Sequence, residues 1–352
     1  MATLQDLLDT VVRSGEVPGA AALVAHGDEV EIANAGDVEQ DSIFRIASTT
    51  KPITAAAMML LVEDGLVALE DPISRWLPEL ASPRVVRTPG SPLDDTVPAA
   101  RPVAVEDLLT FRAGWGFPSD FALPAVTELF EKLPVFGPRE TPDEWVATLS
   151  AIPMLHQPGE SWLYNTCSDI QGVLIARVSG RTLPEFFAER IFQPLGMDDT
   201  GFHVPADKLD RLAPRHGPLP SPTSERLWEE PPIFPSGSGG LVSTLADWHR
   251  FGRMLLADGG GLLSPESVRL MTTDHLTQEQ RDASTLFLEG AGWGFGGSVE
   301  ADGRYGWVGG TGTTAHVAPA SGTVGVLLTQ VPMTGPTPTP LMREFWRYAF
   351  SS

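Results

Sequence analysis

The stretch RIASTTKPITAAAMMLLVEDG, from Arg45 to Gly65, joins a serine and a lysine to a long apolar run. Lys51 follows Ser48 by three residues, a spacing that places both side chains on one face of a helix. The residues after Lys51 are apolar nearly all round, which predicts a buried helix that stops at Gly65. Pro52 fits the first helical turn, where a missing N–H costs little.

The pair of Ser48 and Lys51 suggests nucleophilic chemistry. The start of a helix exposes N–H groups and partial positive charge, which favour a developing oxyanion. Burying a lysine favours its neutral amine, a proton acceptor, and a serine beside such a base can be activated as a nucleophile. The motif is short, so the alternative is a serine N-cap followed by a lysine whose charged end reaches solvent.

The composition predicts a globular chain. It has 352 residues, of which 42% are hydrophobic and 20% charged, enough for a sizeable core. The net charge of −21 should repel nucleic acid and anionic membranes, so we expect neither as a partner. The single cysteine, Cys167, excludes an intramolecular disulfide. The histidines lack metal-ligand spacing, so we expect no metal and no cofactor.

The chain is expected to be cytoplasmic. No apolar run reaches membrane-spanning length. The N-terminal segment is acidic and amphipathic over residues 3–14 and lacks the basic and apolar regions of a signal peptide. One cysteine fits a reducing compartment. The oligomeric state stays open, with a homo-oligomer among the possibilities.

Stretches that resemble β-strands occur near both ends of the chain. Near the start a hairpin is expected, and near the end three further strands. Helical periodicity dominates between them. The expected strands cover residues 19–25, 29–35, 292–300, 313–318 and 322–330, and the later helices cover residues 105–111, 142–150, 169–179, 183–191, 245–258, 264–272 and 341–350.

These patterns predict an α/β (α+β) fold: an antiparallel sheet built from both termini and flanked by helices, with a mostly helical second lobe. Residues 1–65 and 236–352 would form a discontinuous sheet domain. Residues 66–235 would form the helical lobe, with proline-rich loops at 82–102 and 214–235. We expect the active site between the two, because a lobe boundary is a favoured place for a ligand cleft.

A second candidate group is Tyr164, in PGESWLYNTCSDIQG (residues 158–172). A tyrosine that ends an extended segment can direct its phenol into a cleft, and beside an ammonium its pKa is expected to fall. The alternative is a core tyrosine with a satisfied hydroxyl. Asp169, five residues later, is expected to cap the helix that follows.

A third candidate segment is Trp307-Val308-Gly309-Gly310, before a strand-like run. Glycines there allow the backbone to approach a ligand closely. An N–H near Gly310 could pair with that of Ser48 as an oxyanion hole. The alternative is a glycine-rich hairpin turn. His316, on the following strand, either borders the pocket or serves the strand.

The three motifs together resemble the serine β-lactamase and penicillin-binding protein superfamily, and most closely class C β-lactamases and family VIII carboxylesterases. This resemblance implies that Ser48 is the nucleophile, that Lys51 bonds it, and that Tyr164 is the base. It also implies that the N–H groups of Ser48 and Gly310 form the oxyanion hole. Supporting stretches are VPGAAALVAHGDEV, LEDPISRWLPEL, VEDLLTFRAGWG, IFQPLGMDDTGF, SGSGGLVSTLADWHRF and GWGFGGSV.

The departures from this family bear on the substrate. The second motif is often Tyr-x-Asn, but here Thr166 takes the third position and Asn165 comes one residue early, so the amide that contacts lysine is expected to be missing. Trp307 stands where β-lactamases have lysine, so a substrate carboxylate loses its cation unless Arg304 or Arg112 replaces it. We expect five residues to contact substrate: Asn165, Thr166, Trp307, Gly309 and His316.

The sequence therefore predicts a serine hydrolase, a carboxylesterase for small or medium acyl esters, whose partner is a small-molecule ester or amide. One alternative is a β-lactamase or D-amino-acid peptidase, which needs carboxylate recognition. Another is an acyltransferase, which uses the same acyl-enzyme but excludes water. The third is a non-catalytic binding or sensor module, in which Ser48 should resist a fluorophosphonate probe.

Overall fold

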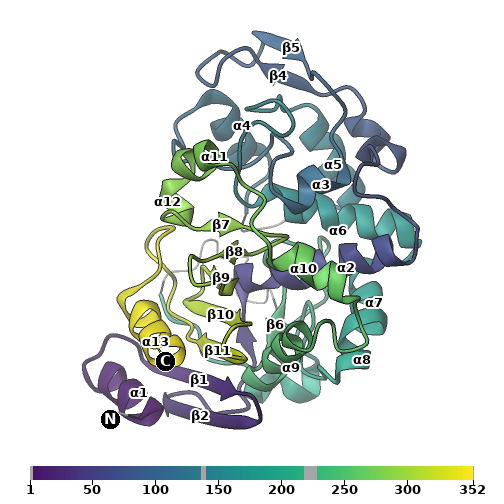
Figure 1. Ribbon diagram of the computed structural model, residues 1–352. Coiled ribbons are helices and arrows are strands. Elements are labelled where there is room, and N and C mark those ends of the chain that lie inside the picture. Colours follow the sequence, from purple (N-terminus) through teal and green to yellow (C-terminus); the bar gives the residue numbers. More distant parts are fainter. Residues whose placement is uncertain (1–2, 136–139, 218–227, 352) are drawn as a thin grey trace.

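A seven-stranded antiparallel sheet forms the centre of the fold. The computed structural model describes residues 3–135, 140–217 and 228–351. The strand order, β2-β1-β11-β10-β9-β8-β7, places strands from both ends of the chain side by side (Figure 1), which confirms the predicted fold class. The strands are β1 (Gly19–His26), β2 (Glu29–Gly36), β7 (Gly292–Trp293), β8 (Ser298–Val299), β9 (Tyr305–Gly309), β10 (Thr313–Ala318) and β11 (Thr323–Leu328).

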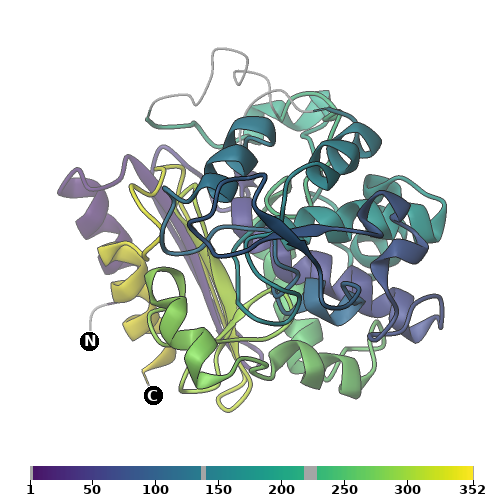
Figure 2. The ribbon, with the colours of Figure 1, turned by 90° about the horizontal axis from the view of Figure 1, so that it is seen from above.

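Helices cover both faces of this sheet. On one face lie α1 (Leu4–Arg13) and α13 (Pro340–Phe350), from the two ends of the chain, and on the other lie α9 (Leu245–Leu256) and the helices of the middle of the chain (Figure 2). Strands β10 and β11 are buried along their whole length. Threonine and valine are frequent in both strands, TTAHVA and TVGVLL, and such β-branched residues favour strands.

The buried helix predicted from the opening stretch is α2 (Lys51–Glu63), which packs against α6 (Thr166–Ser179). The helix stops before Gly65, whose φ is +68°, as expected for a residue that follows a helix. Helical structure begins one residue before Ser48. Ser48 lies in a 3-10 turn (Ala47–Thr50), and the α-helix begins at Lys51.

The strand expected over residues 292–300 is two short strands, β7 and β8, joined by a tight turn. Gly296 has a φ of +75°, a conformation that favours glycine. A side-chain carbon on Gly296 would lie 2.6 Å from the Lys51 carbonyl oxygen. The turn therefore presses against the start of α2, which a continuous strand would not do.

The middle of the chain is mostly helical, as predicted, although the loop at 82–102 contains a small hairpin, and the loop at 214–235 lies partly outside the described residues. The division into two domains remains a prediction. The remaining elements are β3 (Phe44–Arg45), which pairs with β6 (Val242–Ser243), β4 (Arg84–Val86), which pairs with β5 (Thr96–Pro98), α3 (Val105–Leu109), α4 (Pro124–Lys132), α5 (Pro142–Ser150), α7 (Leu183–Phe187), a π-helical turn (Ala188–Phe192), α8 (Gln193–Leu195), α10 (Pro265–Thr272), α11 (Gln278–Ala283), α12 (Thr285–Leu288) and 3-10 turns at Ile73–Arg75, Pro78–Leu80 and Ala206–Arg211.

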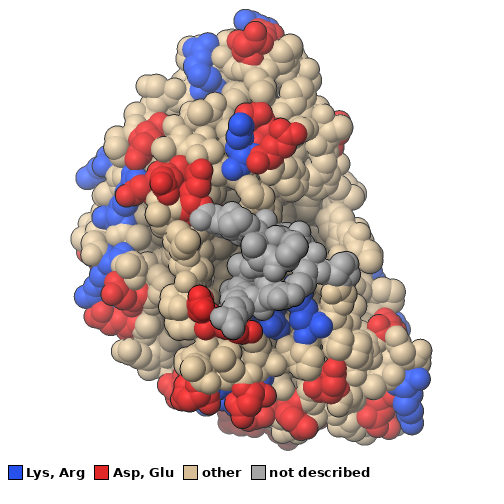
Figure 3. Space-filling model, turned by 180° about the vertical axis from the view of Figure 1, so that it is seen from behind, with Lys and Arg blue, Asp and Glu red and all other residues tan. Residues whose placement is uncertain are grey.

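The surface carries mixed charges. On the face in Figure 3, acidic side chains are interspersed with arginines and lysines. Among the helices of the described segments, none is both long and apolar enough to cross a bilayer. Within the same segments, no group of three or more His, Cys, Asp or Glu side chains is arranged to hold a metal ion.

Candidate active site

Lys51 is the centre of the site. Its side chain is fully buried, and its Nζ donates to Ser48 Oγ at 2.9 Å, to Asn165 Oδ1 at 2.9 Å and to the Ser238 carbonyl at 2.6 Å. An ammonium has three N–H donors, so these three acceptors match a protonated Lys51 better than the neutral amine expected from burial alone. A buried charge is stable only with such partners. The spacing of three residues thus brings the Lys51 amine within hydrogen-bonding distance of the Ser48 hydroxyl, as the sequence predicts.

Tyr164 lies against the same pair. Its ring centroid is 4.6 Å from Lys51 Nζ, and its hydroxyl accepts from Trp307 Nε1 at 2.8 Å and also hydrogen-bonds with Ser48. Burial raises the pKa of Tyr164 to about 12, and the hydrogen bonds with Ser48 and Trp307 oppose that rise only in part. The expected fall of this pKa is wrong, because the desolvation of a phenolate outweighs its hydrogen bonds.

The Trp307 indole is held edge-on by Trp293, with 4.8 Å between the ring centroids. Its indole N–H donates a hydrogen bond to the Tyr164 hydroxyl. Trp307 therefore presents an uncharged donor to the phenol, and its remaining apolar surface carries no charge for a substrate carboxylate.

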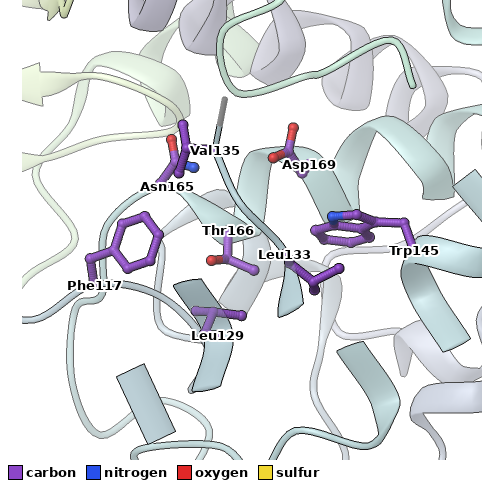
Figure 4. Close-up of a pocket in the computed structure, with 8 residues that line it drawn as sticks. All are labelled: Phe117, Leu129, Leu133, Val135, Trp145, Asn165, Thr166 and Asp169. Atoms are coloured by element: carbon purple, nitrogen blue, oxygen red, sulfur yellow. The ribbon is translucent and has the colours of Figure 1, made fainter. Parts of the chain in front are cut away.

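Asn165 has an unusual backbone conformation, with φ +80° and ψ −63°. Non-glycine residues rarely have positive φ, and such strain clusters at functional sites. The conformation brings its side-chain oxygen to Lys51, so the expectation that this amide is missing is wrong. Thr166 begins α6 and is buried, and both residues line a small pocket with Phe117 and Asp169 (Figure 4).

The segment from Ser236 to Ser238 is a part of the site that the sequence analysis missed. Asp169 is buried and accepts from Ser236 Oγ at 2.6 Å, from Ser238 N at 3.1 Å and from Ser238 Oγ at 3.0 Å. Asp169 therefore holds this loop. The prediction that it caps α6 is wrong. A side-chain carbon on Gly237 would lie 2.4 Å from the Ser168 carbonyl, so only glycine fits. The run of small residues SGSGG, residues 236–240, could have indicated a tightly packed loop at the site.

The end of β9 lies tightly against the segment before Ser48. A side-chain carbon on Gly309 would lie 2.4 Å from the Ile46 carbonyl oxygen, whereas none of the atoms described lies within 4 Å of such a carbon on Gly310. Thr313 Oγ1 also donates to the Ile46 carbonyl at 3.0 Å. The backbone at Gly310 thus adjoins both open space and the nucleophile segment, and its part in an oxyanion hole remains a prediction.

His316 is wrongly predicted to contact substrate. It lies opposite Gly306 in the ladder of β9 and β10, and its ring packs against Trp346 and Phe350 of α13. Side chains alternate along a strand, so Ala315 shares the face of Trp307 and His316 takes the opposite face. Burial there lowers the pKa of His316 to about 3.

Two arginines, Arg304 and Arg112, are the candidate replacements for the missing cation. Arg304 lies over the Trp346 and Phe350 rings and bonds Asp302 at 2.7 Å. Arg112 Nη2 lies 3.6 Å from Glu106. These contacts tie both arginines to other parts of the fold rather than to Trp307.

The candidate site thus joins a buried lysine to a serine, an asparagine and a tyrosine. The chain matches the Beta-lactamase family over residues 4–341, and it belongs to that family. This family's fold carries serine hydrolases and acyltransferases.

Relatives include Protein Rv1367c of Mycobacterium tuberculosis, 39% identical over 323 residues, with 83% of this chain and 78% of that protein covered. Esterase EstB of Burkholderia gladioli is 29% identical over 330 residues, with 84% and 78% covered. The solved structure of EstCE1, described as a hydrolase with promiscuous acyltransferase activity, matches with a TM-score of 0.80 and 22% identity over 98% of this chain and 97% of that one. At that identity it shows the fold alone.

Proposed function

We propose that the protein is a carboxylesterase that hydrolyses small or medium acyl esters through an acyl-enzyme on Ser48. One observation carries the proposal: Lys51 Nζ lies 2.9 Å from Ser48 Oγ, and the Tyr164 hydroxyl bonds the same serine. A nucleophile held by both a cation and a hydroxyl proton relay suits acyl transfer. The likeness to a protein named an esterase, EstB, supports this choice.

In acylation, Ser48 Oγ attacks the ester carbonyl carbon. Because the pKa of Tyr164 is about 12, its phenol is protonated at neutral pH. Tyr164 takes the Ser48 proton as it gives its own to the leaving alcohol, so the charge balances. The buried ammonium of Lys51 stabilises the negative charge that develops on both oxygens.

The carbonyl oxygen becomes an oxyanion, which the N–H groups of Ser48 and Gly310 stabilise in this proposal. The carbonyl re-forms as the bond between its carbon and the leaving oxygen breaks, and that oxygen departs with the proton from Tyr164. Water then attacks the acyl-serine along the reverse proton path, releasing the acid and restoring Ser48. Trp307 supplies no charge for a carboxylate, and this favours neutral esters over β-lactams and peptidoglycan stems.

The test compares p-nitrophenyl acetate, p-nitrophenyl butyrate and a chromogenic cephalosporin as substrates of the wild type and Ser48→Ala. We expect ester turnover that falls at least about 1,000-fold in the variant, since the nucleophile is lost, and little cephalosporin cleavage. Efficient cephalosporin cleavage would overturn the carboxylate argument. Ester turnover that survives in Ser48→Ala would refute the mechanism.

Two further measurements separate the alternatives. A fluorophosphonate probe should label Ser48 in the wild type, whereas a non-catalytic module would stay unlabelled. Product analysis with an added alcohol should give mainly free acid, and a dominant new ester would identify an acyltransferase.

A further inference from the structure

We propose that the site includes a subsite for an aromatic leaving alcohol, formed by four residues that we call the phenylalanine patch: Phe117, Phe121, Phe130 and Phe287. The inference rests on the proposed ester hydrolysis at Ser48 and names the substrate class, esters of alcohols that carry an aromatic ring.

The phenylalanine patch contacts Tyr164 at two points, through the Phe287 ring and through the backbone of Phe117. The Phe287 ring lies 4.8 Å from that of Tyr164 and 6.0 Å from that of Phe121. Phe121 lies 5.8 Å from Phe130, which stacks on Phe117 at 4.2 Å. The backbones of Phe117 and Tyr164 exchange hydrogen bonds of 3.0 and 2.9 Å. A run of contacting aromatic rings thus leads from Tyr164 through Phe287 to the exposed rings of Phe121 and Phe130.

The two phenylalanines that contact Tyr164 are buried, whereas the two that lie between them are more exposed. Phe117 and Phe287 are 5% and 8% exposed, whereas Phe121 and Phe130 are 39% and 36% exposed. Adjacent exposed phenylalanines form the kind of apolar surface that marks a binding site. An aromatic ring covering them would remove apolar area from water and meet aromatic faces and edges.

The segments that carry the phenylalanine patch, the loop before α4 and the helices α11 and α12, are linked by hydrogen bonds in the absence of a ligand. Ser119 Oγ donates to the Ala283 carbonyl at 3.1 Å, which links the loop before α4 to the end of α11. Gln280 of α11 donates to the carbonyls of Gly159 and Glu160 at 2.9 and 3.1 Å. Figure 1 shows α11 and α12 at the same end of the molecule as α4. A subsite that needs no ordering loses less free energy on binding.

The position of the patch favours the alcohol over the acyl group. In the proposed mechanism Tyr164 gives its proton to the leaving oxygen, which must lie within hydrogen-bonding distance of its hydroxyl. The carbonyl oxygen is held instead between Ser48 and Gly310, at the end of β9. The alcohol therefore departs past the Tyr164 ring, where the patch starts.

The test uses ester pairs that change one side at a time. Ethyl acetate and 2-phenylethyl acetate share the acyl group and differ in the alcohol, and ethyl hexanoate changes the acyl group instead. We expect the wild type to prefer 2-phenylethyl acetate over ethyl acetate in kcat/KM. The double variant Phe121→Ala/Phe130→Ala should lower this ratio about tenfold, the range found for changes in apolar pockets.

The matched control is Leu93→Ala, which also removes an exposed apolar side chain, 37% exposed, between β4 and β5. It should leave the ratio unchanged, and thermal melting checks that all variants fold. An unchanged ratio in the double variant would overturn the inference. So would a loss confined to the preference for ethyl hexanoate over ethyl acetate, because the patch would then hold the acyl group.

A binding measurement separates this inference from the proposed function. We expect 2-phenylethanol to slow fluorophosphonate labelling of Ser48 at least threefold more in the wild type than in the double variant, and ethanol to slow neither. Protection without ester turnover would support the subsite while refuting the esterase. Ester turnover with equal protection in both proteins would refute the subsite alone.

Discussion

At the scale of single residues, Trp307 shows how a substitution in a motif changes the chemistry of a site. Its indole donates to the Tyr164 hydroxyl at 2.8 Å. A neutral N–H stabilises a developing phenolate less than an ammonium does. The hydrogen bond nevertheless lowers the pKa of Tyr164 against the effect of burial. Trp307 is thus tied to proton transfer as well as to the choice of substrate.

The variant Trp307→Phe keeps an aromatic ring and removes the donor. We expect kcat/KM for p-nitrophenyl acetate to fall about 10- to 100-fold, since a hydrogen bond to a charged group contributes about 1.5–3 kcal/mol. The pKa of Tyr164 should rise further. Steady-state kinetics across pH, together with the melting temperature, measure both effects.

Trp293→Phe is the matched control, because Trp293 contacts the Trp307 ring and its Nε1 has no hydrogen-bond partner in the described structure. This variant loses packing without losing a hydrogen bond, so its effect should be smaller. Equal losses of kcat/KM in the two variants would show that ring packing, rather than the Trp307 N–H, supports catalysis.

At the scale of elements, the site depends on a loop held between two helices. Asp169 of α6 binds the loop through the Ser236 and Ser238 hydroxyls, and Thr54 of α2 donates to the Gly237 carbonyl at 2.7 Å. These contacts aim the Ser238 carbonyl at Lys51. The orientation of the lysine therefore depends on Asp169 and Thr54 as well as on its own hydrogen bond to Ser48.

The variant Asp169→Asn keeps the shape of the side chain but leaves one acceptor oxygen in place of two. The loop should loosen, and we expect kcat/KM to fall about tenfold or more. The free energy of unfolding should fall by about 1–3 kcal/mol, as for a buried polar group left unpaired. Kinetics and urea unfolding of the same preparation measure both quantities.

Asp247→Asn is a suitable comparison. Asp247 is also buried and accepts from the backbone of Asp199 and the Thr200 hydroxyl, at 2.8 and 2.9 Å. A similar loss of stability with nearly full activity is expected there. If Asp247→Asn lost as much activity as Asp169→Asn, the loop would have no special part in orienting Lys51.

At the scale of the whole molecule, burial keeps several titratable groups neutral. Burial raises the pKa of Tyr164 and of Cys167 to about 12 and lowers the pKa of His316 to about 3. These groups lie on α6, on β10 and on the segment before α6, so their neutral forms depend on the packing of sheet and helices together. Unfolding would return each group to water and to its ordinary pKa.

Stability should therefore be greatest between about pH 6.5 and 9. For Tyr164 and Cys167 the folded pKa is raised, so their stabilisation is complete below the unfolded pKa and is lost as pH rises toward about 12. For His316 the folded pKa is lowered, so stabilisation is lost as pH falls from about 6.5 toward 3. Each group contributes a slope of up to about 1.4 kcal/mol per pH unit.

Urea unfolding at pH 5, 7.5 and 10 checks this, with the highest midpoint expected at pH 7.5. Cys167→Ala should reduce the loss between pH 7.5 and 10, because one group that ionises on unfolding is gone. A midpoint that rose from pH 7.5 to 10 would contradict the assignment of these groups as neutral and buried.

The sequence by itself determined what is local. The spacing of Ser48 and Lys51 is set within one helical turn, and the β-branched residues of β10 and β11 favour strands. Tertiary structure decided the rest. The partners of Lys51 at Asn165 and Ser238 are 114 and 187 residues away, Trp307 reaches Tyr164 across 143 residues, and strand pairing turned His316 toward α13. Burial also set the direction of the Tyr164 pKa. These properties arise only when distant segments meet and exclude water, so local patterns do not encode them.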